Sequence, residues 1–320
     1  MPLRIEDYAL IGDWKTAALV GRDGSIDWLC WPRFDSPACF AALLGTTDNG
    51  RWLIATKDAP VTINRRYRPG TLILETEFET DTGCAAIIDC MPPADGGNLV
   101  RIVAGHSGRV VFQTELVLRF NYGASVPWVN RLDDGTINAI AGPERLVLRT
   151  PTSLYGEDLK TLGEFTIEAG QSIPFVLCYG SSFQSPPPPI DPFQALENTE
   201  MFWRKWSDRC PDVGPWTEAV KRSLITLKGL TYAPTGGIIA AATTSLSYFH
   251  YYHRTRTHLS LNKDCPQPRH IHRQDYCVPP GGRSASSLRT SRCVNSAVAA
   301  QTRVQCRPPC MAANCGPCFG

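Results

Sequence analysis

Apolar and polar positions alternate with a period of two through most of the first 180 residues, a pattern typical of β-strands. The alternation is clear in residues 71–80, after which a turn at 81–83 returns the chain through 84–89. Similar short segments bounded by Gly, Pro, Asp or Asn are predicted at 10–12, 15–20, 25–30, 99–104, 110–118, 137–141, 146–150, 164–169 and 173–179.

The spacing of these segments leaves no room for helices before residue 190. Parallel strands need long crossover connections, whereas antiparallel strands are joined by short turns. Asp23-Gly24 is such a turn signal, because glycine adopts the positive φ that a tight hairpin requires. The pattern therefore predicts a mainly β fold, an antiparallel β-sandwich.

The pattern changes after a proline run at 185–189, which predicts a stiff linker. Asp191 and Pro192 are typical of a helix start, and apolar residues follow at partly helical spacing to residue 208. A second helix is predicted from about residue 214 to 230. Its apolar stripe consists of Trp216, Val220, Leu224, Leu227 and Leu230.

The composition breaks sharply after Leu246. Residues 1–246 hold 22 Lys and Arg against 28 Asp and Glu, a net charge of −6, whereas residues 247–320 hold 10 against 2, a net of +8. Seven of the 13 cysteines and five of the six histidines follow the break, and all eight tryptophans precede it. Two differently composed pieces are joined here, and the second is expected to be a mostly disordered basic tail.

The apolar runs and the cysteines indicate in which compartment the protein is expected. No apolar run approaches the roughly 18 residues of a membrane-spanning helix, and the N-terminus has no apolar core of a signal peptide. The six scattered cysteines of the first piece are typical of reduced thiols. We therefore expect a cytoplasmic protein that makes no membrane contact.

Four motifs near the N-terminus resemble a known family: IEDYALIGD at 5–13, TAALV at 16–20, GSIDWLC at 24–30 and PRFDSP at 32–37. They are similar to the N-terminal region of bacterial glycoside hydrolase family 15, the glucoamylase- and trehalase-like enzymes. LKGLTYAPTGG at 227–237 and TTSL at 243–246 are similar to the start of that family's catalytic domain. The resemblance covers about residues 3–246. It implies a trehalase-like N-terminal sandwich, an (α/α)6 barrel, inverting hydrolysis of an α-glucoside and no cofactor.

The resemblance places the catalytic acid and base in the barrel, beyond the point where the resemblance ends, so no catalytic residue is assigned here. A loop at 31–37 would lean toward the sugar pocket of the intact parent enzyme, which makes Trp31, Arg33 and Asp35 substrate-proximal candidates. The alternative, favoured for the acids Asp13, Asp27 and Asp35, is turn and capping chemistry, with the tryptophans filling the core. His106, which lies between Gly105 and Gly108, is expected in a loop.

The tail carries other signals. Residues 247–269 resemble the C-terminal end of an insertion-element integrase core, without its metal-binding acids, and residues 270–320 resemble no family known to us. Cys306, Cys310, Cys315 and Cys318 have the spacing of a zinc site, but few apolar residues surround them, which favours unbound thiols. Interleaved arginines and tyrosines would attract nucleic acid weakly and in a salt-dependent manner.

Four segments are predicted: a β-sandwich at 1–184, a linker and the first helices of a truncated catalytic domain at 185–246, the integrase-like fragment at 247–269, and the Cys- and Arg-rich tail at 270–320. The predicted function is that of a non-catalytic N-terminal domain of a family 15 hydrolase, truncated, chimeric and inactive. The alternatives are an active hydrolase of the glucoamylase or trehalase type and a nucleic-acid-binding transposase remnant.

Overall fold

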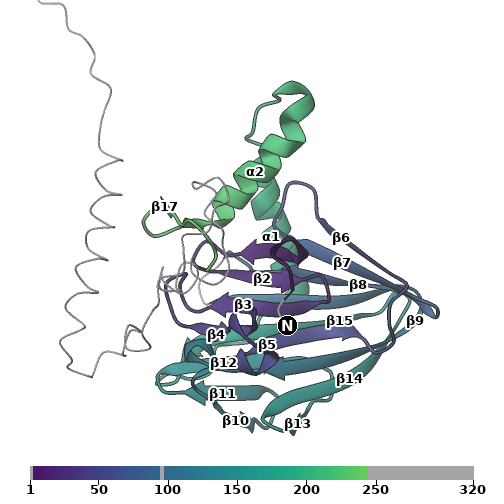
Figure 1. Ribbon diagram of the computed structural model, residues 1–320, viewed down its shortest axis with the longest axis vertical. Coiled ribbons are helices and arrows are strands. Elements are labelled where there is room, and N and C mark those ends of the chain that lie inside the picture. The colour runs from purple at the N-terminus through teal and green to yellow at the C-terminus, as the bar shows by residue number, and fades with distance from the viewer. Residues whose placement is uncertain (1–2, 94–96, 244–320) are drawn as a thin grey trace, which may run out of the picture. The chain divides into compact units, whose positions relative to one another are not determined.

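The computed structural model describes residues 3–93 and 97–243, which belong to one compact unit. Fifteen strands form one antiparallel hydrogen-bonded network, and two helices follow it (Figure 1). The strands are β1 Tyr8–Gly12, β2 Ala17–Gly21, β3 Ser25–Cys30, β4 Ala38–Phe40, β5 Arg51–Thr56, β6 Thr62–Tyr67, β7 Leu74–Thr80, β8 Gly83–Cys90, β9 Asn98–Val117, β10 Trp128–Arg131, β11 Ile137–Ala141, β12 Glu144–Arg149, β13 Tyr155–Glu157, β14 Lys160–Glu168 and β15 Ser172–Ser181.

The helices are α1 Pro192–Ser207 and α2 Thr217–Gly229, and a small hairpin of β16 Thr231–Tyr232 and β17 Gly237–Ile238 follows α2. Short 3-10 turns are η1 Ile5–Asp7, η2 Ala42–Leu44, η3 Thr47–Asn49, η4 Asn121–Gly123 and η5 Gly214–Trp216. The predicted class, mainly antiparallel β followed by two helices, is thus confirmed. The basic tail after residue 246 lies outside the described residues.

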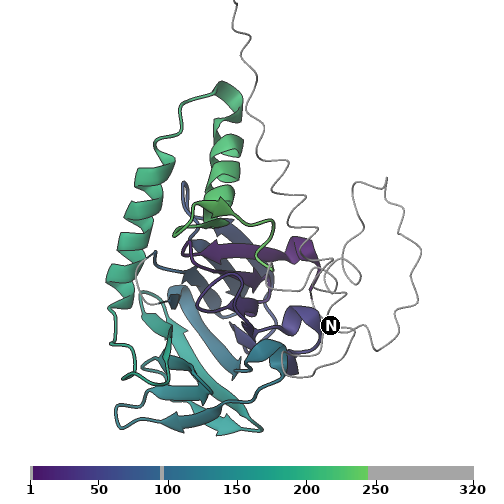
Figure 2. The same ribbon diagram turned by 90° about the vertical axis from the view of Figure 1, so that its left-hand side faces the viewer.

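The long strand β9 belongs to both layers of the sandwich. Its first half pairs with β8 and β15, in a layer that runs β6-β7-β8-β9-β15-β12-β11-β10. Its second half pairs with β5 and β14, in a layer that contains β1, β2, β3 and β13 as well. The two views show the strands folded over into these layers (Figures 1 and 2).

The strand changes layer at a β-bulge. Ala85 of β8 pairs with Gly105 and Cys84 pairs with Ser107, so His106 has no opposite residue. Gly108 has a φ of +60°, which glycine adopts without strain. The prediction of separate strands at 99–104 and 110–118 with His106 in a loop was therefore wrong, because the glycines bend the strand without ending its hydrogen bonding.

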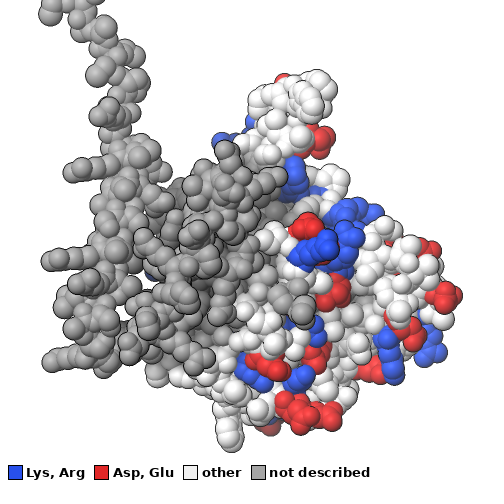
Figure 3. All heavy atoms as spheres, in the orientation of Figure 1, with Lys and Arg blue, Asp and Glu red and all other residues white. Residues whose placement is uncertain are grey.

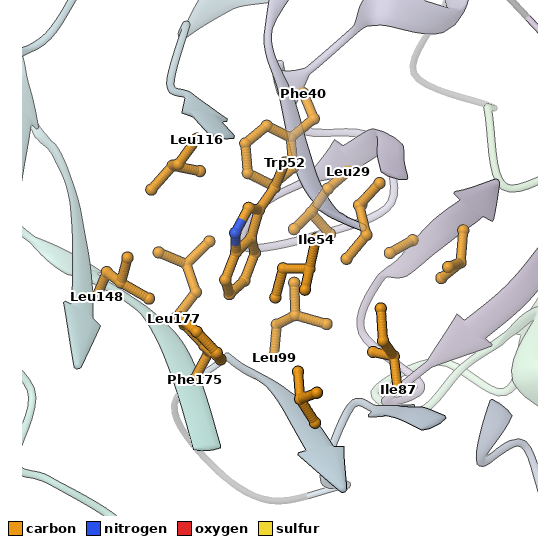
Figure 4. Packing of buried hydrophobic residues seen from close by; sticks show 14 of the residues in the cluster. Leu29, Phe40, Trp52, Ile54, Ile87, Leu99, Leu116, Leu148, Phe175 and Leu177 are labelled. Atoms are coloured by element: carbon orange, nitrogen blue, oxygen red, sulfur yellow. The ribbon is translucent and has the colours of Figure 1, made fainter. Parts of the chain in front are cut away.

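Large side chains from both layers meet in the interior (Figure 4). Trp52 of β5 lies edge-to-face against Phe175 of β15, with ring centroids 6.3 Å apart. Phe165 of β14 stacks on Phe112 of β9 at 5.7 Å. Such aromatic pairs add about 0.5–1.5 kcal/mol to the hydrophobic burial of each ring. The tryptophans of the 25–52 region fill the interior, as the sequence indicated.

A buried ion pair crosses this core. Asp89 of β8 and Arg101 of β9 face each other in register, and the Arg101 Nε donates to Asp89 Oδ1 at 2.7 Å. The same guanidinium donates to the carbonyl oxygens of Trp52, at 3.1 Å, and of Gly24, at 2.7 Å, both in the opposite layer. Burial raises the pKa of Asp89, and the Arg101 charge opposes that shift. One side chain thus joins four parts of the sandwich.

Helix α1 covers the outer face of the β8–β9–β15–β12 layer. Asp191 caps the helix as predicted, because its Oδ1 accepts hydrogen bonds from the Phe193 and Gln194 amides. Leu196 packs on a layer of apolar residues that includes Ile73, Cys90, Val100, Ile102, Val147, Val176 and Cys178. This layer of the sandwich is therefore covered on both of its faces.

Helix α2 turns a different face to the sandwich from the predicted stripe. Ile225 is buried with Leu72 and Trp203, and Gly229 is buried as well. Trp216, Leu224 and Leu227, which formed most of the predicted stripe, are exposed. Gly229 allows this close approach because it has no side chain to collide with Leu72.

Removing one partner of the ion pair should be costly. We expect Asp89→Ala to lower the free energy of unfolding by about 3–5 kcal/mol, because it leaves the Arg101 charge buried without a counterion. Urea denaturation of the full chain measures this value. Lys57→Ala is the matched control, since the Lys57–Glu164 pair is exposed and should contribute less than about 1 kcal/mol. Equal effects of the two substitutions would contradict this account of the core.

Candidate functional site

Residues 230–243, which follow α2, return to the sandwich and pack on β1, β2 and the loop at 31–37. Phe34 and Ala242 are buried together with Ala17 of β2, and Leu230, Tyr232 and Ile239 pack around them. Phe34 meets the Tyr232 ring edge-on, with centroids 6.4 Å apart. We call this contact the docking site, and residues 230–243 the docked segment.

Two hydrogen bonds fix the docked segment to the sandwich. The Trp28 indole Nε1 donates to the carbonyl oxygen of Ala242 at 3.0 Å. The Ala233 amide donates to the carbonyl oxygen of Trp14 at 2.8 Å. Because Trp28 is in β3 and Trp14 in the β1–β2 turn, the segment is held at both of its ends.

Trp14 is wedged between the sandwich and both helices. Its ring lies 4.3 Å from that of Phe202 and 6.0 Å from that of Trp203, both of α1. The Lys228 ammonium of α2 lies 4.0 Å from the ring centroid. Trp14 has a φ of +70°, a conformation that is uncommon for residues other than glycine. The contacts on its ring hold it there.

Asp13 closes the turn that carries Trp14. Its Oδ1 accepts hydrogen bonds from the amides of Lys15, at 2.9 Å, and Thr16, at 2.8 Å. Its Oδ2 is buried and accepts no hydrogen bond within the described part of the chain. Burial raises the pKa of Asp13 to about 6, against the opposing effect of the two amides. A carboxyl with a pKa of about 6 therefore lies in the turn that carries Trp14.

Asp27 also has a structural contact. The Tyr8 hydroxyl donates to its Oδ2 at 2.6 Å, across the β1–β3 side of the sandwich. Burial raises the pKa of Asp27 and that of Tyr8. These contacts are the turn and packing roles favoured for the N-terminal acids.

The three substrate-proximal candidates are divided by the structure. Trp31 is only 1% exposed and packs in the core, with its ring 6.2 Å from that of Tyr179. Arg33 and Asp35 lie at the surface as an ion pair, with the Arg33 Nε donating to Asp35 Oδ1 at 2.8 Å. The Arg33 guanidinium lies 5.7 Å from the Tyr232 ring centroid, and its hydrogen bond, together with its charge, lowers the pKa of Asp35. Arg33 thus adjoins the docked segment, Asp35 is paired with it at the surface, and Trp31 does not reach the surface.

Sequence reasoning missed Phe34 and Trp14. Phe34 lay within a quoted motif, and its apolar side chain in a polar loop was an available signal for a buried contact. Nothing in the sequence indicates that Trp14 adopts a positive φ, because that conformation depends on the packing of α1 and α2 against its ring.

Several other charged residues form ion pairs. Acidic and basic side chains are interspersed over the face drawn in Figure 3. The basic cluster of Arg66 and Arg68 binds Glu75, and Arg68 also binds Glu200 of α1 at 2.5 Å, so it helps to hold the helix. Within residues 3–93 and 97–243, no three His, Cys, Asp or Glu side chains come together as a metal site. The cysteines Cys306, Cys310, Cys315 and Cys318 lie outside the described residues.

None of the helices in the described ranges, α1 and α2 included, has the length and hydropathy needed to span a bilayer.

The fold and the docking site define a class: an antiparallel β-sandwich domain followed by two helices and a segment that docks back on the sandwich. Residues 1–167 match the family described as "Trehalase-like, N-terminal", and the chain belongs to this family.

Curated relatives extend the similarity along the chain. The trehalase of Mycobacterium tuberculosis is 32% identical over 276 aligned positions, which cover 76% of this chain and 39% of that protein. The trehalase of Mycolicibacterium smegmatis is 31% identical, and that of Thermoplasma volcanium 28%; each alignment covers 76% of this chain and 40% of the relative. The chain thus spans about two fifths of the length of these relatives. The integrase-like interpretation of residues 247–269 gains no support from these matches, and those residues lie outside the described part.

Asp13 gives the unfolding free energy a defined pH dependence. Its pKa is about 6 in the folded chain and near 3.8 in the unfolded chain, so the folded state holds the proton more tightly. Protonated Asp13 therefore contributes on the order of 3 kcal/mol to the free energy of unfolding below about pH 4, and this contribution is lost as the pH rises to about 6. We expect Asp13→Asn to remove this loss, as measured by urea denaturation at several pH values.

Asp35→Asn is the matched control, because Asp35 is exposed and its pKa is lowered by Arg33. Its unfolding free energy should keep the pH dependence of the unmodified chain between pH 4 and 6. An Asp13→Asn chain that still loses stability to the same extent over that interval would contradict the assignment.

Proposed function

We propose that residues 3–243 act as the non-catalytic N-terminal domain of a trehalase-like family 15 glycoside hydrolase, and that this chain does not itself hydrolyse a glycoside. The parent enzyme acts on an α-glucoside. The part played by the sandwich is mechanical: it binds the opening elements of the helical catalytic domain and holds them in position.

The docking site is the observation that carries this proposal. Residues 230–243 contact Phe34, Trp28 and the β1–β2 turn. This segment directly follows α2, the first helix whose sequence resembles the family's catalytic domain. A sandwich that buries apolar surface against a segment of the next domain stabilises that segment. The exposed stripe of Leu224 and Leu227 on α2, with Trp216 of η5 directly before the helix, is then the face left for further helices of the parent enzyme.

The acids of the N-terminal motifs support a non-catalytic role. An inverting glycosidase needs two carboxyls about 6.5–9.5 Å apart, with space between them for a water molecule. Asp13 and Asp27 are buried and closed into turn and strand contacts. Asp35 is at the surface but is paired with Arg33. Each of the three has a role in the fold that requires no substrate.

Nucleic-acid binding is not proposed. It would depend on residues after 246, and no contact within the described part favours it.

The proposal predicts that the chain releases no glucose. The purified 320-residue chain is incubated with trehalose and, separately, with maltose, and glucose is measured by a coupled enzymatic assay. We expect the rate to equal that of buffer, while a full-length relative such as the Mycobacterium tuberculosis trehalase, assayed in parallel on trehalose, serves as the positive control.

A near-ultraviolet circular dichroism spectrum of the same sample verifies that the tryptophan-rich core is folded. Glucose release that rises in proportion to the concentration of a folded chain would contradict the proposal. Asp35→Asn would then be the first variant to test, because Asp35 is the N-terminal acid that reaches the surface.

A further inference from the structure

The edge strand β10 exposes an unusual tryptophan. Trp128 is 78% exposed, and of the eight tryptophans in the chain only Trp216, at 71%, is comparable. Trp216 lies on the α2 face that the proposed function already uses, whereas β10 lies at the opposite end of the described unit (Figure 1). A large aromatic ring in water on an edge strand favours unwanted association, which makes Trp128 a candidate contact for a ligand.

The strand register shows which residues share a face with Trp128. Trp128 is paired with Ile140, Asn130 with Asn138, and Asn138 in turn with Val147 of β12. Side chains alternate along a strand, and the neighbouring residues Ile137, Ala139 and Leu146 belong to the core between the layers. Trp128, Asn130 and Asn138 therefore lie together on the outer face of the β10–β11–β12 sheet.

The two asparagines leave a polar atom unsatisfied. The Asn138 Nδ2 donates to the Asn130 Oδ1 at 2.9 Å. Asn138 is only 5% exposed, and its Oδ1 accepts no hydrogen bond within the described part of the chain. Buried polar atoms in proteins are nearly always hydrogen-bonded, so a hydroxyl or an N–H that reached this acceptor, beside an exposed aromatic ring, would be stabilised there.

A hollow of about 330 Å³ lies farther along the same sheet, beside the proline-rich linker, and Thr136, two residues before Asn138, is among its lining residues. Thr136 and Arg149 contribute polar groups to its lining, and Val176 and Ile190 contribute apolar ones. The Arg149 Nη2 donates to the Pro187 carbonyl at 2.6 Å, which holds the linker as one wall. The volume is within the range of small-molecule sites, and the lining mixes hydrogen-bonding groups with apolar surface.

We propose that this outer face binds a glucan chain, at a site separate from the catalytic domain of the parent enzyme. The Trp128 ring stacks on the apolar face of one glucose unit, the exposed Asn130, held by Asn138, binds hydroxyl groups, and the hollow beside Arg149 takes a further unit. We call it the glucan face. The choice of a sugar rests on the proposed function, because a glycoside hydrolase domain meets α-glucosides.

The chemistry of the glucan face favours a neutral polyol over a charged ligand or a second copy of the chain. Asp134 and Arg149 both line the hollow and balance each other in charge, so neither an anionic nor a cationic ligand is favoured. A ring that presents one apolar face and a rim of hydroxyl groups satisfies both Trp128 and the asparagine pair. A second copy of the chain, paired strand to strand at β10, would use the backbone instead and would leave the Asn138 acceptor unpaired.

The test is native gel electrophoresis of the full chain with and without soluble starch, an α-1,4-linked glucan, in the gel. We expect starch to retard the chain, Trp128→Ala to weaken the apparent affinity at least tenfold, and Trp128→Phe to restore part of it. Trp216→Ala is the matched control, because it removes a tryptophan of similar exposure from η5, directly before α2, and should leave the retardation unchanged.

Three results would overturn the glucan face: no retardation of the unmodified chain, equal retardation of the Trp128→Ala chain, or equal loss in the Trp216→Ala chain. Sedimentation velocity of the same samples tests the rival occupant. A dimer that Trp128→Ala converts to monomer, with no effect of starch on either chain, would assign β10 to self-association instead. The assay needs no hydrolysis, so its failure is distinguishable from a failure of the proposed function, which glucose release tests.

Discussion

The buried pair of Asp89 and Arg101 is the interaction on which the sandwich depends. It lies where β8 and β9 face β5 and the β2–β3 turn. The Arg101 guanidinium donates hydrogen bonds to the Asp89 carboxylate and to two carbonyl oxygens of the opposite layer. A charge without water is tolerated only when it is paired and hydrogen-bonded, so the two layers must approach in one arrangement. Gly24 is part of this constraint, because its turn brings a carbonyl oxygen within reach of Arg101.

That arrangement also positions the docking site. β9 passes from one layer to the other at its glycine bulge, and the layer it enters through β5 carries β3, β2 and β1 in order. The β1–β2 turn then presents Trp14 to both helices, while β3 presents Trp28 to the docked segment. The buried Asp13 carboxyl accepts hydrogen bonds that stabilise this turn. The contact of Trp14 with the helices therefore depends on whether Asp13 is protonated.

Much of this fold could be predicted from the sequence, because apolar alternation and turn residues are local signals. The Asp23-Gly24 hairpin and the Asp191 helix cap were of this kind, and the family motifs indicated the sandwich. β10, with every residue exposed, has no apolar periodicity to detect, whereas β5 does alternate and was overlooked. The bend of β9, the positive φ of Trp14 and the burial of Trp31 depend on contacts between residues far apart in the chain. The loop at 31–37 could likewise be predicted as a feature of interest from its motif, but its contact through Phe34 could not, because that contact is with residues far away in the chain.

The central claim is that the sandwich holds the opening elements of a helical domain, and hydrogen–deuterium exchange of the full chain tests it most directly. We expect peptides from residues 230–243 to be protected to an extent similar to that of β1 and β2, and Phe34→Ala to remove this protection while β9 stays protected. Exchange of residues 230–243 at the rate of an unstructured peptide in the unmodified chain, beside a protected β9, would contradict the claim.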